Sequence, residues 1–108
     1  MAKFVILKRA NGEFQFNLVA GNGQVILTSE GYAAKSSCEN GIESVKKNSA
    51  NESNFDKKTS ANGKFFFNLK ASNGQIIGSS EMYESESSRN NGIASVQKNA
   101  PDANIESE

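Results

Sequence analysis

Hydrophobic and polar residues alternate along three short stretches near the start of the chain. This alternation predicts strands over Lys3–Lys8, Glu13–Ala20 and Gln24–Ser29, because a period of two is typical of a strand with one buried face. Four residues form that face on the middle strand: Phe14, Phe16, Leu18 and Ala20. Asn11-Gly12 and Asn22-Gly23 separate the strands, and we expect type I′ hairpin turns there because Asn and Gly tolerate positive φ.

The hydrophobic period lengthens after Tyr32. Three apolar residues fall on one helical stripe: Cys38, Ile42 and Val45. This stripe predicts a helix that begins near Ser36, which has capping-box spacing to Glu39. Gly41 lies on the same side, so the missing side chain would let the helix approach the sheet closely.

The whole pattern then occurs a second time. Residues 10–57 align with residues 61–108 at a constant offset of 51, without a gap, and roughly half of the positions are identical. The second copy predicts a helix from about Ser87 to Asn99, with a weaker cap because Asn90 replaces the glutamate. Phe55 aligns with Phe4, so it ends one unit and begins the next.

The duplication suggests how the chain is organised. A unit of about 50 residues buries too little surface to be comfortably stable alone, so we expect the copies to share one core. We predict a single domain over residues 1–108, made of one repeat over residues 1–51 and another over residues 52–108. Strand exchange between the repeats would satisfy their edges, which predicts a monomer that is an internal pseudo-dimer.

Composition narrows the classes of function. Twelve basic and twelve acidic residues leave no net charge to attract phosphate backbones or anionic membranes. The single cysteine, Cys38, forms no internal disulfide, and no N-terminal apolar stretch has the length of a signal peptide or membrane span. We therefore expect a cytoplasmic protein without a membrane partner.

The chain contains no histidine. This excludes Ser-His-Asp and Cys-His catalysis and histidine metal sites, so we predict no catalytic residues, no metal and no cofactor. The best remaining constellation is Glu30 with Tyr32, repeated as Glu81 with Tyr83. The two glutamates would form a two-carboxylate site if the pseudo-twofold axis brought them together. We favour the alternative that the tyrosines pack at the sheet edge and the glutamates are solvated.

The outward side of the central strands offers another candidate site. Five residues alternate with the buried ones and are predicted to form a binding surface: Gln15, Asn17, Phe66, Asn68 and Lys70. Such a surface could stack a base or hold an extended peptide. The alternative is that an antiparallel sheet simply shows its polar side to water.

Two repeated motifs resemble a known family. NGQ-x-I-x-x-SE-x-Y spans Asn22–Tyr32 and recurs at Asn73–Tyr83, and NGI-x-SV-x-KN spans Asn40–Asn48 and recurs at Asn91–Asn99. They resemble the small bacterial YegP-like proteins of unknown function. The resemblance implies an α+β fold of two tandem β-β-β-α-β repeats, which form one antiparallel sheet with two packed helices and swapped terminal strands. It implies no activity.

The sequence therefore favours a small, non-enzymatic interaction module with an unknown protein or small-molecule partner. Nucleic-acid binding through Phe66 and Lys70 is the first alternative, and the neutral charge argues against it. A histidine-free enzyme that uses the glutamates and tyrosines is the second.

Overall fold

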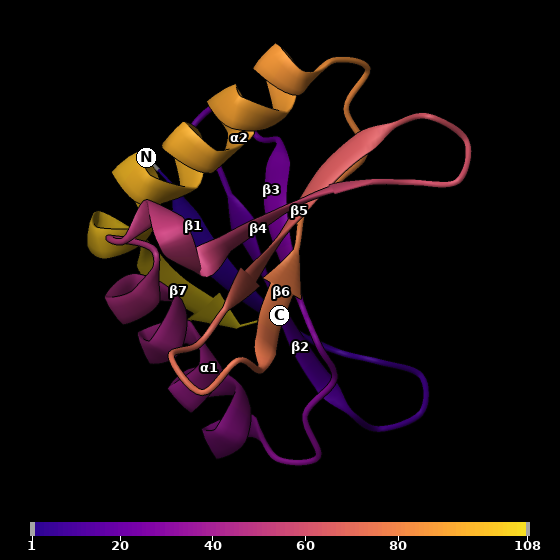
Figure 1. Ribbon diagram of the computed structural model, residues 1–108. Helices are drawn as coiled ribbons and strands as arrows, with labels where there is room; N and C mark the ends of the chain where they lie inside the picture. Colours follow the sequence, from indigo (N-terminus) through magenta and orange to yellow (C-terminus); the bar gives the residue numbers. More distant parts are fainter. Residues whose placement is uncertain (1, 108) are drawn as a thin grey trace.

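The computed structural model describes residues 2–107, which form seven strands and two helices (Figure 1). The first half contains β1 (Lys3–Lys8), β2 (Phe14–Val19), β3 (Val25–Ser29) and α1 (Lys35–Asn48). The second half contains β4 (Phe55–Thr59), β5 (Phe65–Lys70), β6 (Ile76–Ser79), α2 (Glu86–Asn99) and β7 (Asn104–Ser107). Short 3-10 turns, Glu52–Asn54 and Ala100–Asp102, connect each helix to the strand that follows it. Within residues 2–107 no helix has the length and hydropathy needed to cross a membrane.

All seven strands belong to one sheet in the order β4-β5-β6-β3-β2-β1-β7. The predicted α+β fold with one sheet and two helices is confirmed, and so is the strand exchange. The strand after α1 pairs with β5 of the second repeat, and the strand after α2 pairs with β1 of the first. One detail of the prediction is corrected: the sheet is mixed, because β7 runs parallel to β1. β4 follows α1 and pairs with β5, so the equivalent partner of β7, which follows α2, would be β2. The place beside β2 is already occupied by β1.

The two repeats meet where β3 pairs with β6. Thr28 lies opposite Ser79, and these residues are also equivalent at the repeat offset of 51. A pseudo-twofold axis therefore passes through this pair. The strand order on either side of it, β3-β2-β1 and β6-β5-β4, is the same.

Both helices cover the same face of the sheet. The predicted apolar residues of the strands and helices form one buried cluster there, with the largest fully buried side chains at Phe4, Phe16, Phe67, Leu18, Leu27, Ile42 and Leu69. An edge-to-face pair of rings repeats in both halves: Phe4 with Phe16, with centroids 5.7 Å apart, and Phe55 with Phe67, 5.5 Å apart.

The hairpin turns differ from the predicted type I′ geometry. Among residues 2–107 only glycines have positive φ, including 88° at Gly12 and Gly23, so the preceding asparagines are not left-handed. The N–H of Gly23 donates to the carbonyl of Ala20, and the N–H of Ala20 donates to the carbonyl of Gln24. This is a three-residue loop with a left-handed glycine. Asn22 contributes through its side chain, which accepts from the Gln24 N–H.

The N-terminal caps of both helices also differ from the prediction. Helix α1 begins one residue before Ser36, and its N-cap, Ala34, provides no side-chain hydrogen bond. Helix α2, for which we expected the weaker cap, has Ser85 as its N-cap, and that side chain accepts from the Ser88 N–H. Both N-cap residues are extended, as is usual at this position, and each lies two residues after a tyrosine that is bridged to the sheet.

The glycine inside each helix provides space for a tyrosine. A Cβ atom at Gly41 would lie 2.3 Å from the hydroxyl oxygen of Tyr32, and one at Gly92 would lie 2.4 Å from that of Tyr83. Tyr32 stacks on Phe16 with ring centroids 6.3 Å apart. A Cβ atom at Gly41 would also lie 3.1 Å from the ring of Phe16, which confirms the predicted close approach of helix and sheet. Tyr32 is bridged to Phe14 of the interior strand β2, so it does not lie at the sheet edge as predicted.

We predict that the two repeats unfold together. Leu18 and Leu69 are equivalent, fully buried residues of different repeats, and replacing either by alanine should lower the free energy of unfolding by about 2–5 kcal/mol. Calorimetry of each variant should show one transition, with equal calorimetric and van't Hoff enthalpies. Two separate transitions, with only one shifted by each substitution, would contradict the shared core.

We also predict that Gly41→Ala destabilises the protein, although alanine is the better helix former by about 1 kcal/mol. The new methyl group collides with Tyr32, and overpacking of this kind costs about 1–3 kcal/mol. Chemical denaturation measures the change. The matched variant Gly92→Ala should behave alike, and adding Tyr32→Phe to Gly41→Ala should recover part of the loss. Stabilisation by Gly41→Ala alone would disprove the packing argument.

Candidate functional site

The five residues predicted to form a binding surface lie on the sheet face opposite the helices. Phe16 and Phe67 face Gly41 and Gly92 of the helices, so their strand neighbours Gln15 and Phe66 point the other way. Asn17 and Asn68 lie in one row across the sheet, because Asn17 pairs with Thr28, Thr28 with Ser79, and Ser79 with Asn68. The structure thus brings these residues onto one surface.

Several of these side chains already have partners within the sheet. The amide oxygen of Asn68 accepts from the Ser79 hydroxyl at 2.6 Å, and Asn68 is only 8% exposed. The ammonium of Lys70 lies 3.1 Å from the Asp56 carboxylate, and this hydrogen bond is the main cause that lowers the pKa of Asp56. Gln15 donates to Asn17 at 3.2 Å. Whether this outer face binds a partner stays a prediction.

The hypothesis of a Glu30–Glu81 carboxylate pair is wrong. Glu30 lies two residues beyond Thr28, and Glu81 lies two residues beyond Ser79 on an antiparallel strand, so they extend in opposite directions from the axis. At about 3.4 Å per residue this separates them by roughly 14 Å along the strands. Both glutamates are exposed, as expected.

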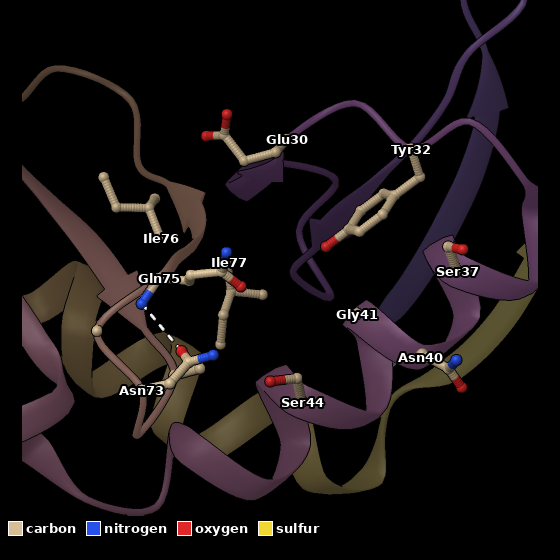
Figure 2. Close-up of a pocket in the computed structure, with 12 residues that line it drawn as sticks. Glu30, Tyr32, Ser37, Asn40, Gly41, Ser44, Asn73, Gln75, Ile76 and Ile77 are labelled. Atoms are coloured by element: carbon tan, nitrogen blue, oxygen red, sulfur yellow. Dashed lines mark hydrogen bonds between the residues drawn. The ribbon is translucent and has the colours of Figure 1, made fainter.

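Glu30 and Tyr32 instead border a cavity of about 740 Å³ between the two repeats (Figure 2). The first repeat contributes residues of α1 and of the segment before it: Glu30, Tyr32, Ser37, Asn40, Gly41 and Ser44. The second repeat contributes the β5–β6 turn and the start of β6: Ala71, Asn73, Gly74, Gln75, Ile76 and Ile77. We call this space the inter-repeat cavity. In Figure 2 the hydroxyl of Tyr32 points toward Ile77 across it, Ser44 lies on its helical side, and Glu30 stands at its rim.

Tyr32 is held in the protonated form at the cavity. Burial is the main cause that raises the pKa of its phenol, and the charges of Cys38 and Glu30 add to the effect. Burial, followed by the charge of Glu81, raises the pKa of Tyr83 in the same way. At neutral pH both phenols are therefore hydrogen-bond donors, and neither is poised to act as a base.

The residues of the inter-repeat cavity are repeated with unusual fidelity. At the offset of 51, eleven of its twelve lining residues have an identical counterpart in the other repeat, the exception being Ile76 opposite Val25. Of the other 36 aligned positions, only 13 are identical. The lining is therefore more alike between the repeats than the rest of the chain.

Packing explains part of this identity but not all of it. Tyr32 and Gly41 touch one another, and the side chain of Asn73 accepts from the Gln75 N–H in its turn. Three polar pairs, however, are exposed in both repeats and have no side-chain hydrogen bond or ion pair within residues 2–107: Gln24 and Gln75, Glu30 and Glu81, Asn40 and Asn91.

Comparison with known proteins identifies the family. The model for a domain of unknown function, DUF1508, matches residues 10–56 and again residues 60–107. The chain belongs to the DUF1508 family. It is 56% identical over 96 residues to the UPF0339 protein YegP of Escherichia coli, covering 89% of this chain and 87% of that protein. It is 53% identical over 102 residues to a UPF0339 protein in the ptx operon 5′ region of Stutzerimonas stutzeri, covering 94% and 92%.

Two solved structures of similar proteins have the same fold. The solution NMR structure of YegP from E. coli, described as a protein of unknown function, superimposes with a TM-score of 0.94 at 50% identity and covers 99% of this chain and 92% of that chain. A UPF0339 protein from Shewanella oneidensis superimposes with a TM-score of 0.92 at 49% identity, covering 98% and 90%. The resemblance to YegP-like proteins is confirmed, and the names of these relatives state no activity.

We predict that both tyrosines ionise above their ordinary pKa of 10.0 in the folded protein. A raised pKa contributes stability that is complete below pH 10 and is lost as the pH rises through the folded values. Ultraviolet absorbance of tyrosinate measures this directly, since the chain has two tyrosines and no tryptophan. Tyr83→Phe isolates Tyr32, and unfolding in denaturant should return the midpoint to about 10. A folded-state midpoint at or below that value would contradict the burial of the phenols.

Proposed function

We propose that the chain is a non-enzymatic cytoplasmic binding module and that its inter-repeat cavity holds a small polar molecule. The observation that carries this proposal is the identity of the exposed polar pairs around the cavity. Substitutions of exposed residues without partners usually change stability by less than about 0.5 kcal/mol, so folding alone does not require Gln24, Glu30 or Asn40 to match their counterparts. A shared ligand would require it.

The dimensions and chemistry of the cavity support a small ligand. Its volume of about 740 Å³ falls within the range of about 300–1,000 Å³ that is typical of small-molecule sites. Apolar side chains such as Ile77 lie beside hydroxyl and amide groups from Tyr32, Ser44 and Gln75. This mixture offers an apolar wall together with groups that orient a polar ligand.

The arrangement supports binding better than catalysis. The cavity offers one carboxylate, on Glu30, and a phenol whose raised pKa keeps it protonated. General acid–base chemistry commonly needs two titratable groups whose environments push their pKa values apart. The second carboxylate considered from the sequence, Glu81, lies on the other side of the pseudo-twofold axis.

The outer sheet face is a second candidate. It supports the nucleic-acid alternative because both helices lie on the opposite face and leave Phe66 and Lys70 accessible in part. Asp56 argues against it, because its carboxylate lies 3.1 Å from Lys70 and 3.3 Å from Lys58 and so offsets one of the two lysine charges that would attract phosphate.

Amide correlation spectra recorded during titrations would separate the two candidates. With n-butanol, n-butylamine and butyrate as probes, we expect at least one to shift the amide signals of Gly41, Gly74 and Gln75 while the outer-face signals stay fixed. Gln75→Ala should weaken that binding with little change in melting temperature, and Phe66→Ala is the matched control that should not affect it.

The same spectra have two outcomes that would overturn the proposal. One is the absence of any shift at the cavity with all three probes at about 10 mM, where an efficient fragment of this size would bind. The other is a response confined to Gln15, Asn17, Phe66, Asn68 and Lys70 when single-stranded RNA is added. That response would assign binding to the outer face.

A further inference from the structure

We propose that the ligand of the inter-repeat cavity carries a primary ammonium group on a short alkyl chain, and that the chain has two such sites. This inference rests on the proposed function and specifies its ligand. It is carried by the charges and polar groups around the cavity and by the topology that repeats them.

The charge of the cavity points to a cationic ligand. Among the described residues that line it, Glu30 is the single charged residue, and no lysine or arginine is present. Within residues 2–107 the Glu30 carboxylate has no ion-pair partner. Arg9 lies near Gly31, but its guanidinium is 3.5 Å from the Glu13 carboxylate and 2.7 Å from the Gln15 amide oxygen. Its charge is thus balanced by another carboxylate, which leaves the negative charge of Glu30 available.

A primary ammonium fits this carboxylate better than a metal ion or an anion does. An ammonium has three donors and no acceptor, so it can donate one hydrogen bond to the exposed Glu30 carboxylate and the others to water at the rim. Calcium takes about six to eight oxygen ligands, often with several carboxylates, and the lining provides one carboxylate. A phosphate or carboxylate ligand would meet Glu30 with no compensating cation in the lining.

The apolar part of the lining accounts for the alkyl chain. Ala71, Ile76 and Ile77 come from the β5–β6 hairpin, on the side of the cavity opposite the helix, and Ile76 is 41% exposed. An exposed isoleucine beside a polar cavity gains from apolar cover, at about 25 cal/mol per Å² of surface removed from water. An alkylammonium can place its methylene groups there while its charged end stays with Glu30 at the rim.

The second site follows from the pseudo-twofold axis. Helix α1 contacts β2 of its own repeat and β6 of the other, and α2 correspondingly contacts β5 and β3. At the offset of 51, the counterparts of Glu30, Gly41 and Gln75 are Glu81, Gly92 and Gln24, and we infer the second site from this equivalence. The apolar wall is also retained, because Val25 and Ile26 replace Ile76 and Ile77.

The full-length chain tests this inference through the affinities of n-butylamine and n-butanol, measured separately at the amides of each site. We expect n-butylamine to bind about tenfold more tightly, as a hydrogen bond to a charged group allows, and the difference to shrink with added salt. Glu30→Gln should remove the preference for n-butylamine over n-butanol at the amides of Gly41 and Gln75, and should leave it unchanged at those of Gly92 and Gln24. Glu81→Gln should have the opposite effect. Glu39→Gln removes an exposed carboxylate outside the lining and should change neither site.

A second probe, the blocked lysine Nα-acetyl-lysine methylamide, tests whether the cavity accepts the lysine side chain of a peptide as well as a small alkylamine. The inference is supported if n-butylamine or the blocked lysine binds and if that binding depends on Glu30. Equal affinities for n-butylamine and n-butanol at the cavity would overturn it while leaving the proposed function intact. A response to Glu30→Gln at both sites would overturn the assignment of two separate sites. The absence of binding by every probe would instead remove the proposed function itself.

Discussion

The antiparallel pairing of β3 with β6 is the constraint on which the other features of this protein depend. It brings Thr28 opposite Ser79 and joins two half-sheets, each too small to bury its aromatic residues alone. Equivalent residues close to a twofold axis contact one another, so a large side chain on both would collide. The chain has Leu27 in one repeat and Gly78 in the other, where a Cβ atom would lie 3.1 Å from Cγ of Leu27 and 2.9 Å from the Thr28 carbonyl oxygen. One leucine therefore fills the volume on the axis.

The same junction determines how the edges of the sheet are protected. The inner strands of both repeats face each other at the axis, so the edges that remain are β4 and β7. Lys57 and Lys58 are exposed on β4, and every residue of β7 is exposed. Charged, short edge strands oppose pairing with further chains. This arrangement fits the prediction of a monomer, whose direct test is the mass of the chain in solution.

Much of the fold was predictable because the period of the hydrophobic residues reflects which side of each strand or helix is buried. The strand Lys3–Lys8 has the predicted bounds, and the stripe of Cys38, Ile42 and Val45 is fully buried. The parallel β7 was not predictable, because its place depends on β1 having already occupied the position beside β2. The cap of α1 was predicted wrongly because the bridge of Tyr32 to Phe14, and not the local preference of Ser36, determines where the helix begins.

The inter-repeat cavity was missed for a related reason. Its two walls are separated by 27 residues in the sequence, from Ser44 to Ala71, and nothing in the period of either wall indicates that they meet. A usable signal was nonetheless present in the alignment of the repeats. Buried positions are expected to be alike in both copies, so the informative identities are those at exposed polar positions such as Gln24 and Gln75. Sorting the identical positions by expected burial would have drawn attention to them before the fold was known.

The contact that holds each helix on the sheet also forms part of the cavity. Tyr32 stacks on Phe16, rests on Gly41, and still points its hydroxyl into the space between the repeats. A side chain held from two sides loses little conformational freedom when a ligand binds, so its hydrogen bond contributes to affinity with a small entropic cost. The wall on the other side, the β5–β6 turn, reaches its place through the β3–β6 pairing. The inter-repeat cavity is therefore completed by the second repeat, and the first repeat folded alone would lack half of its lining.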